Sequence, residues 1–478
     1  MNIQVSPSSI QSSEEAIAYL RSPQAIRDRC GQLFELARQD KLSHFRCDLT
    51  QLRRVASYVI AVMQEQYPDG QIPFHSRWQH FEVGGVPRLA QLERMLEGLS
   101  PVDRAVTQFD LAIVSVLLDA GAGDRWLYCE RETDLIFQRS EGLAVASFCM
   151  FCQGAFSSHP HRLLQVDARG LQSLSEATLA QGFQVSADNP LVGLAGRVEL
   201  LQKLGRSLLA YPQMFGDDNP RPGNLVHYLL QQSHNKQLPA ATVLRAVLEG
   251  LGNIWPGRIE IAGVNLGDVW HHPALDTNSQ LKQAPHTTHH DAANADAAPM
   301  RDAAPMDGEP ILPPAWKPAL PPTCEDASPS AASPRTTLLP DSLVPFHKLS
   351  QWLTYSLLEP LQELGLEIVG LDDLTGLPEY RNGGLCLDLG LLQAKHSDIF
   401  QHVYSVDSEV VVEWRALTVI LLDQIAATIR KQLDLNATQL PLVKILQGGT
   451  WSAGRRIAAE LRANGVPPMQ LQSDGTVF

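Results

Sequence analysis

The sequence has 478 residues, and its 38 basic and 52 acidic side chains give a formal net charge of −14. Only 19% of the residues are charged and 44% are hydrophobic, a composition typical of a globular protein with a sizeable core. Nucleic acids and anionic membranes bind basic surfaces, so the net charge argues against both as partners. We expect a small-molecule substrate, no nucleic acid and no membrane.

The cysteines and the N-terminus indicate the compartment. The seven cysteines follow no spacing typical of a disulfide framework, and the first thirty residues contain no apolar signal segment. No stretch reaches the roughly 18 apolar residues that a membrane span requires. Cys149 and Cys152 form the single CxxC, without a second pair, so we interpret them as core residues. These features predict a cytoplasmic protein with no metal and no cofactor.

Most of the chain has helical periodicity. Apolar residues recur at intervals of three and four, bounded by Ser, Pro and Gly signals, with Ser13 expected to cap the first helix. The helical patterns cover residues 13–23, 49–67, 101–123, 191–210, 222–233, 241–252, 346–364 and 408–433. Strand patterns cover only 259–266, 366–371 and 384–390. The expected fold is a mainly α-helical globule with a small β element.

One change of composition divides the chain. Residues 275–341 are rich in Ala, Pro, Asp, Ser and His and have no apolar periodicity, which predicts a disordered insertion. His286, His289 and His290 lie in it, and we interpret them as part of a solvated tract rather than a metal site. The helical part at 10–274 and the helical part at 342–478 are expected to pack together and form one site.

Two N-terminal segments carry chemistry. His75, Arg77 and Trp78 precede a Gly-Gly turn and suit a ligand-binding loop. The alternatives are a packed structural loop and a zinc site, to which the five-residue spacing of His75 and His80 bears only a loose resemblance. Asp119 follows a strongly apolar helix, where the negative end of the macrodipole disfavours a carboxylate. A cation or a catalytic role would explain Asp119; a cap on the next turn or a pair with Arg125 would explain it equally.

Two C-terminal segments also carry residues suited to catalysis or ligand binding. Glu379, Tyr380 and Arg381 precede Asn382-Gly383-Gly384, which predicts a tight turn. Such a turn can present an acid or base beside a cation, and Asp388 follows a few residues later. A surface hairpin is the alternative. Gly448-Gly449 before Thr450 predicts an N-capped helix whose free N–H groups bind an anion, with Arg455 and Arg456 one turn on. An ordinary capped amphipathic helix is the alternative there.

Some polar residues interrupt apolar helices. His347 and Lys348 lie near the start of the helical pattern at 346–364, beside its apolar stripe. Glu413 and Arg415 are two residues apart and cannot face each other, so each needs its own partner. We expect these two, with Asp423, to form buried ion pairs.

Nine stretches together resemble a known family. They are IPFHSRWQHFEVGG, LLDAGAG, RSEGLAVASF, NPLVGLAGR, LGDVWHHP, PFHKLSQWLTYSLLEP, GLPEYRNGGL, EWRALTVILLD and GTWSAGRRIA. They look like the uncharacterised-domain family encoded with the ring-opening route of uracil catabolism in fungi and bacteria. A fold-level likeness to queuosine-salvage nucleoside glycosylases implies a helical fold related to DNA glycosylases.

The resemblance implies a late step in which a ribosylurea-type intermediate, with or without a 5-phosphate, is cleaved at its N-glycosidic bond to urea and ribose or ribose 5-phosphate. Such cleavage needs an acid for the leaving group and a carboxylate for the sugar. The expected catalytic residues are Asp119, Glu379 and Asp388. The expected substrate-binding residues are His75, Arg77, Trp78, His347, Lys348, Tyr380, Arg381, Trp451 and Arg455.

Other functions stay open. A metal-dependent hydrolase would attack the ureido carbonyl instead, and a non-catalytic scaffold would bind a metabolite or partner and convert nothing. A phosphoribosyl transferase is disfavoured, because no acidic pair precedes a Thr/Gly phosphate loop.

Overall fold

The computed structural model describes residues 12–256, 258–276 and 340–472. Within these ranges the chain is mainly helical, as the sequence predicts, and its strands form only short pairs. None of the described helices is long and apolar enough to cross a membrane. His286, His289, His290 and most of the predicted insertion lie outside the described residues.

Capping residues set the start of several helices. The Ser12 hydroxyl accepts the Glu15 N–H, and the Glu15 side chain accepts the Ser12 N–H, a capping box one residue before the predicted cap Ser13. Ser100 caps a helix whose first residue is a proline. The helices before the gap are α1 Ser13–Leu20, α2 Pro23–Arg38, α3 Leu52–Gln66, α4 Arg77–Phe81, α5 Arg88–Met95, α6 Pro101–Leu117, α7 Arg139–Cys152, α8 Ala168–Ser173, α9 Glu176–Gly182, α10 Leu194–Ala210, α11 Pro212–Phe215, α12 Leu225–Gln232 and α13 Ala240–Gly250.

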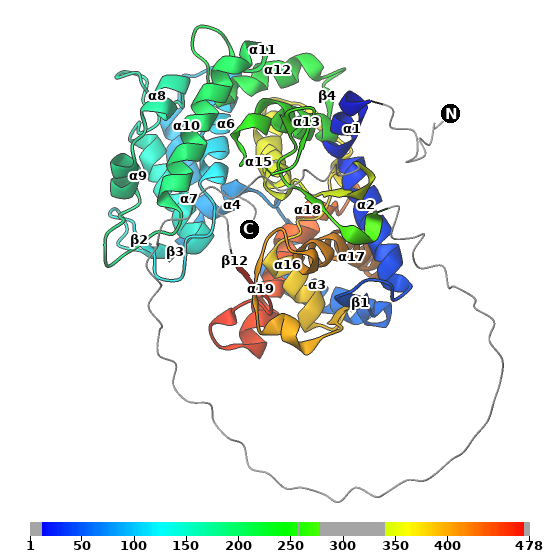
Figure 1. Cartoon of the computed structure of the whole chain (residues 1–478). Coiled ribbons are helices and arrows are strands. Elements are labelled where there is room, and N and C mark those ends of the chain that lie inside the picture. The colour runs from blue at the N-terminus through cyan, green and yellow to red at the C-terminus, as the bar shows by residue number, and fades with distance from the viewer. Residues whose placement is uncertain (1–11, 257, 277–339, 473–478) are drawn as a thin grey trace, which may run out of the picture.

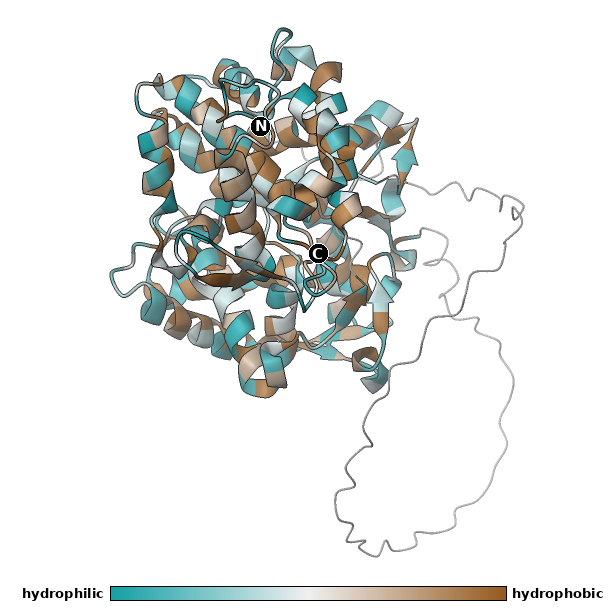
Figure 2. Ribbon diagram, turned by 90° about the vertical axis from the view of Figure 1, so that its left-hand side faces the viewer, coloured by the Kyte–Doolittle hydropathy of each residue, from teal (hydrophilic) through white to brown (hydrophobic). Residues whose placement is uncertain are grey.

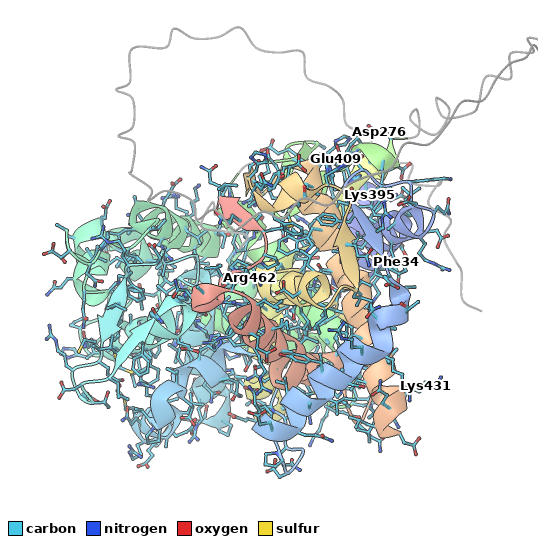
Figure 3. All side chains as sticks on the ribbon, turned by 90° about the horizontal axis from the view of Figure 1, so that it is seen from below. Phe34, Asp276, Lys395, Glu409, Lys431 and Arg462 are labelled. Atoms are coloured by element: carbon cyan, nitrogen blue, oxygen red, sulfur yellow. The ribbon has the colours of Figure 1, made fainter. Side chains whose placement is uncertain are left out.

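The helices after the gap include one long, buried helix. They are α15 Lys348–Glu363, α16 Tyr380–Asp388, α17 Glu409–Leu433, α18 Leu442–Ile445 and α19 Trp451–Leu461. Every residue from Val410 to Val419 in α17 is buried, so this helix is a core element. Figure 3 shows Glu409, at the start of α17, and Lys431, near its end, at opposite edges of the molecule.

The strands pair in twos. The antiparallel pairs are β1 Phe45–Cys47 with β10 Leu392–Ala394, β2 Leu127–Cys129 with β3 Ile136–Gln138, β5 Glu260–Ile261 with β6 Val264–Asn265, and β7 Val269–His271 with β8 Leu343–Pro345. The parallel pairs are β4 Gln237–Pro239 with β9 Glu367–Val369, and β11 Val403–Ser405 with β12 Gln470–Gln472. β1–β10, β4–β9 and β7–β8 each join a strand before the gap to a strand after it.

The two ends of the described chain pack on each other. The blue helices α2 and α3 lie beside the orange α17, while the cyan and green helices α6 to α12 form the other half of the molecule (Figure 1). α15 packs against α6 and α13 where the two halves meet. Figure 2 shows brown apolar turns and teal polar turns alternating along the helices, the pattern of amphipathic helices around a shared core.

The strand pattern at 384–390 is wrong, and so is the tight turn at Asn382-Gly383-Gly384: both fall in helix α16. Gly383 is there for close packing, since a Cβ would lie 2.6 Å from the Trp414 ring. The N-cap prediction for Thr450 is also wrong. Leu446–Thr450 is a π-helical turn that continues α18 into α19, so these N–H groups are not an open helix end.

The charged residues of α17 have separate partners, as the sequence predicts, but of the three expected buried ion pairs only that of Arg415 is formed: the Asp423 pair is partly exposed, and Glu413 pairs with no described Lys or Arg. Arg415 binds Asp268 with two contacts of 2.8 Å, and Asp423 binds Arg27 at 2.9 Å. Glu413 instead accepts the backbone N–H of Phe45 at 2.6 Å. The ion pairs tie α17 to the loop before β7 and to α2.

Candidate active site

A pocket of about 460 Å³ lies where the two helical parts of the chain meet. Its walls come from the loop before α4, the loop after α6, and the starts of α7, α15, α16 and α19. Its polar and aromatic lining residues are His75, His80, Asp119, Asp124, Arg139, Ser140, Lys348, Trp352, Glu379, Tyr380 and Trp451. Six of the twelve residues predicted for the site are among them: His75, Asp119, Lys348, Glu379, Tyr380 and Trp451.

Asp119 follows directly on α6, and Arg77 compensates the unfavourable position. Arg77 Nη1 lies 3.2 Å from Asp119 Oδ1, and the Ser140 hydroxyl donates to Asp119 Oδ2 at 2.7 Å. Arg77 is completely buried, and its Nε donates to Ser115 at 2.7 Å. The predicted alternative, a pair with Arg125, is not formed. Arg77 and Ser140 thus hold the Asp119 carboxylate in place at the pocket wall.

Glu379 forms the N-cap of α16. Its two carboxylate oxygens accept the N–H groups of Arg381 and Asn382, each at 2.6 Å. Burial raises the pKa of Glu379, while these N–H groups and the charge on Lys348 act in the opposite direction. Each oxygen has a second lone pair, so the carboxyl group can carry a proton without losing the cap.

Two cations face the pocket. Lys348 begins α15, where Asp268 accepts its backbone N–H at 3.0 Å. Burial lowers the pKa of Lys348, and Glu379 and Asp119 are the acidic groups that counteract it most strongly. Arg139 is exposed at the start of α7, in a left-handed conformation with φ 55°. Among the described residues, neither side chain forms a hydrogen bond or ion pair, so both are available to an anionic ligand.

Two histidines in the pocket are neutral. Burial lowers the pKa of His75 to about 4 and, together with Arg77, that of His80 to about 3. His75 Nδ1 lies 2.8 Å from Gln447 Oε1, which assigns the proton to Nδ1 and leaves Nε2 as an acceptor. His80 Nδ1 lies 3.2 Å from Arg77 Nη1 and is therefore an acceptor, so the His80 proton is on Nε2.

Trp352 and Trp451 supply the aromatic walls. The ring centroids of His75 and His80 lie 5.7–6.5 Å from those of both tryptophans. The Arg77 guanidinium lies over the Trp352 ring, 5.5 Å from its centroid. This combination of aromatic faces, neutral imidazoles and carboxylates is suited to a sugar, which offers both an apolar face and hydroxyl groups.

Six predicted residues do not line the pocket. Arg77 supports it from behind, and the Trp78 indole donates to Ser356 O at 2.7 Å in a neighbouring pocket. His347 is buried and donates from Nε2 to Leu20 O at 2.8 Å. Asp388, at the end of α16, forms a bidentate pair with Arg462 at 2.7 and 2.5 Å.

The two remaining arginines lie outside the same opening. Arg381 donates to Gly465 O at 2.8 Å and lies over the Tyr380 ring. Arg455 lies over the Trp451 ring and pairs with Glu141 at 3.1 Å. Both arginines, with Arg139, line an adjoining surface pocket, so a larger anionic ligand has further cations within reach.

Sequence reasoning missed several lining residues. Trp352 lies on the apolar stripe of α15, a position typical of a core residue. Ser140 gives no signal in the sequence, because its contact with Asp119 exists only in the folded chain. Asp268, which fixes both Arg415 and the start of α15, belongs to the stretch LGDVWHHP. Its isolation between glycine and apolar residues is a signal that could have identified it.

Comparison with known proteins confirms the family resemblance drawn from the motifs. A protein family described as "Protein of unknown function (DUF1688)" matches residues 19–294 and 322–478. The chain is 35% identical to "Protein urg3" of Schizosaccharomyces pombe over 474 residues, which cover 98% of this chain and 100% of that protein. It is 34% identical to "Uracil catabolism protein 4" of Lachancea kluyveri over 495 residues, which cover 97% and 99%.

Proposed function

The chain belongs to the DUF1688 family of proteins of unknown function, and we propose that it catalyses a late step of uracil catabolism. The step is hydrolysis of the N-glycosidic bond of a ribosylurea-type compound to urea and ribose or ribose 5-phosphate. The observation that carries the proposal is the placement of Asp119, Glu379 and Lys348 in one pocket with aromatic walls. The name of the Lachancea kluyveri relative supports the pathway.

Asp119 acts on the sugar. Its contacts with Arg77 and Ser140 fix the direction of the carboxylate. As the glycosidic bond breaks, positive charge develops on the ribose, and an ionised carboxylate stabilises that charge or activates the attacking water. Arg77 is a positioning residue here, because it acts through Asp119.

Glu379 acts on the leaving group. Urea leaves poorly as an anion, so its nitrogen must receive a proton as the bond breaks. The raised pKa of Glu379 makes it the proton donor, in the way that unequal environments separate two carboxyl groups into acid and base. The products are neutral urea and a ribose that has gained the hydroxyl group of the water.

Lys348 and Arg139 bind the polar end of the substrate. A 5-phosphate on the ribose would be held by the Lys348 ammonium and the Arg139 guanidinium, neither of which has a partner among the described side chains. This favours the phosphorylated substrate over the free riboside. Trp352 and Trp451 cover the apolar face of the sugar and exclude bulk water from the reacting carbon.

The test is urea release from ribosylurea and from its 5-phosphate, measured by a coupled assay with and without chelator. We expect chelator-insensitive release of urea in equal amount to ribose 5-phosphate, with a higher kcat/KM for the phosphorylated compound. Ammonia in place of urea would transfer the proposal to a metal-dependent ureido hydrolase. Binding of either compound without turnover would make the protein a scaffold of the pathway and end the enzymatic proposal.

A further inference from the structure

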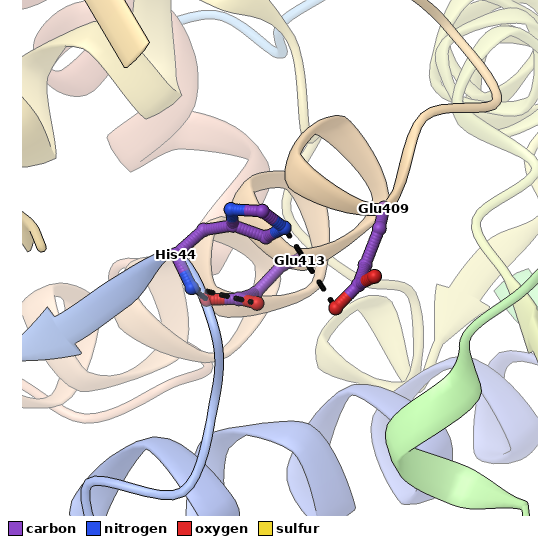
Figure 4. Close-up of side chains that lie close together, drawn as sticks. All are labelled: His44, Glu409 and Glu413. Atoms are coloured by element: carbon purple, nitrogen blue, oxygen red, sulfur yellow. Dashed lines mark hydrogen bonds and ion pairs between the residues drawn. The ribbon is translucent and has the colours of Figure 1, made fainter. Parts of the chain in front are cut away.

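A second group of polar residues lies away from the pocket, at the start of α17. Glu409 and Glu413 are one turn apart on this helix, and His44 approaches them from the residue before β1 (Figure 4). One ligand atom of each of the three residues lies within 4.8 Å of the others. None of them lines the candidate active site.

We propose that His44, Glu409 and Glu413 bind a divalent transition-metal ion, of which zinc is the best match. One imidazole and two carboxylates form a mixed nitrogen and oxygen donor set of the kind that zinc accepts. Zinc ligands at 2.0–2.2 Å from the metal are about 3.4 Å apart in a tetrahedron. His44 Nε2 and Glu409 Oε1 are 3.7 Å apart, and the ligand atoms of all three residues lie within 4.8 Å of one another, so side-chain rotations would have to bring them closer around the ion.

The unsatisfied polar atoms of the group support this assignment. His44 Nε2 is buried and has no hydrogen-bond partner, although its ring points toward the two glutamates. Buried polar atoms are nearly always partnered in folded proteins, so this orphan nitrogen needs an explanation. A bound ion provides one, because it takes the nitrogen lone pair that the described side chains leave unused.

Glu413 is the innermost ligand. Its side chain is completely buried, and of the described residues no lysine or arginine forms an ion pair with it. The Phe45 N–H donates to Oε1 at 2.6 Å, and the His44 N–H lies 3.2 Å from Oε1 and 3.4 Å from Oε2. Within the described part of the chain Oε2 has only this longer hydrogen bond, so it is the oxygen with a lone pair to offer to the ion. A completely buried carboxylate needs a charged partner, and a bound cation would supply one here.

His272 is the positioning residue of this site. It is completely buried, and its Nε2, which has no hydrogen-bond partner, lies 3.9 Å from Glu413 Oε2. The Ala274 N–H donates to Nδ1 at 3.2 Å, so the ring proton is on Nε2 and faces the glutamate. A polar group that lies beside a metal-binding carboxylate in this way orients the carboxylate.

The exposure of the ligands gives the ion a route from solvent. The side chains of His44 and Glu409 are 26% and 36% exposed, whereas Glu413 closes the inner side. Once bound, the ion would join β1 to the first turn of α17, two segments that are far apart in the sequence. We therefore assign it a structural role, separate from the hydrolysis proposed above.

The experiment uses the untagged full-length chain, stripped with chelator, in a background in which His286, His289 and His290 are alanine. That background removes the histidine-rich tract as a second source of zinc binding. Isothermal titration with Zn²⁺ should give one ion per chain, and Zn²⁺ should raise the melting temperature by several degrees. Co²⁺ should give the visible absorption bands of a low-symmetry, four-coordinate site.

Variants identify the ligands. His44→Ala and Glu409→Gln should each weaken zinc binding at least about tenfold, and His272→Ala about 10-fold to 100-fold through loss of orientation. His402→Ala and Asp407→Asn, which replace exposed neighbours, should leave the affinity unchanged. Absence of stoichiometric zinc binding, or equal affinity in His44→Ala, would overturn the proposal, and neither result would affect urea release.

Discussion

At the scale of single residues, Asp119 shows how a local rule and a distant partner combine. The rule that a carboxylate is unfavourable after a helix C-terminus identifies it from the sequence as a residue that needs compensation. The structure supplies that compensation from Arg77, buried on α4, and not from its sequence neighbour Arg125. A residue held in this way is pre-organised, which a catalytic carboxylate requires.

Asp119→Asn should lower urea release by about 10²–10⁴-fold, because the neutral amide cannot stabilise the charge on the sugar. Its melting temperature should also fall, because the amide leaves the completely buried Arg77 guanidinium without a carboxylate partner, so turnover is compared at a temperature at which both variants are folded. The coupled urea assay measures the effect. Asp388→Asn is the matched control: it removes a carboxylate that pairs with Arg462 outside the pocket, and turnover should stay close to that of the native chain. Equal loss in both variants would contradict a special role for Asp119.

The neutral histidines predict a pH effect on stability. The pKa of His75 is about 4 in the folded protein and about 6.5 ordinarily. Between these values the unfolded chain binds a proton that the folded chain does not, so this residue destabilises the fold as the pH falls from 6.5 to 4. The free energy of unfolding of His75→Gln should therefore fall by about 3 kcal/mol less than that of the native chain over this interval.

Urea denaturation at several pH values measures this difference. The difference in the free energy of unfolding between His75→Gln and the native chain isolates the histidine. The buried carboxyl groups Glu359 and Glu413 have raised pKa values, so they stabilise the fold as the pH falls, but they do so in both chains. His402→Gln, at an exposed position, should follow the native curve. Parallel curves for His75→Gln and the native chain would refute the prediction.

At the scale of elements, α16 and α19 show where local signals mislead. Gly383 and Gly384 look like turn residues, yet they lie in helix α16. A Cβ at Gly383 would lie 2.6 Å from the Trp414 ring, and one at Gly384 would lie 3.1 Å from Pro468, so close packing explains the glycines. Gly454 in α19 is similar: a Cβ there would lie 2.3 Å from the backbone oxygen of Arg381. These glycines let α16 pack tightly on α19 and α17, which in turn sets the position of Glu379 and Trp451.

Gly454→Ala should destabilise the protein by about 1–3 kcal/mol, because the methyl group forces α19 away from α16. Gly196→Ala in α10 is the matched control, since a Cβ there meets nothing within 4 Å and alanine is the better helix former. This second change should stabilise the protein by up to about 1 kcal/mol. Thermal unfolding of the two variants tests the pair, and the same sign for both would contradict the packing argument.

At the scale of the whole molecule, the segment that is not described begins and ends at neighbouring positions. β7 and β8 pair across it in antiparallel register, and the His272 N–H donates to Ser342 O at 3.0 Å. Three of the strand pairs join the parts before and after the gap, and both parts line the pocket. The fold therefore does not depend on a long connection to bring its halves together.

Deletion of residues 280–335 should leave the melting temperature and urea release close to those of the full chain. The remaining residues are enough to join the two neighbouring ends, and a shorter loop costs less closure entropy. Differential scanning calorimetry and the coupled urea assay measure both quantities. A chain that no longer folds would show that the segment contributes to the core.

The sequence by itself determined the helical class, the position of eight of the eighteen described α-helices and the composition change at 275–341, because helical periodicity and capping are local properties of neighbouring residues. It also identified six of the eleven polar and aromatic residues that line the pocket, because they lie on polar segments that interrupt the helical pattern. Tertiary structure alone decided which groups meet: Arg77 with Asp119, Asp268 with Arg415, and His44 with Glu413. Those pairings depend on which distant surfaces pack together, and no local pattern encodes how closely two helices approach.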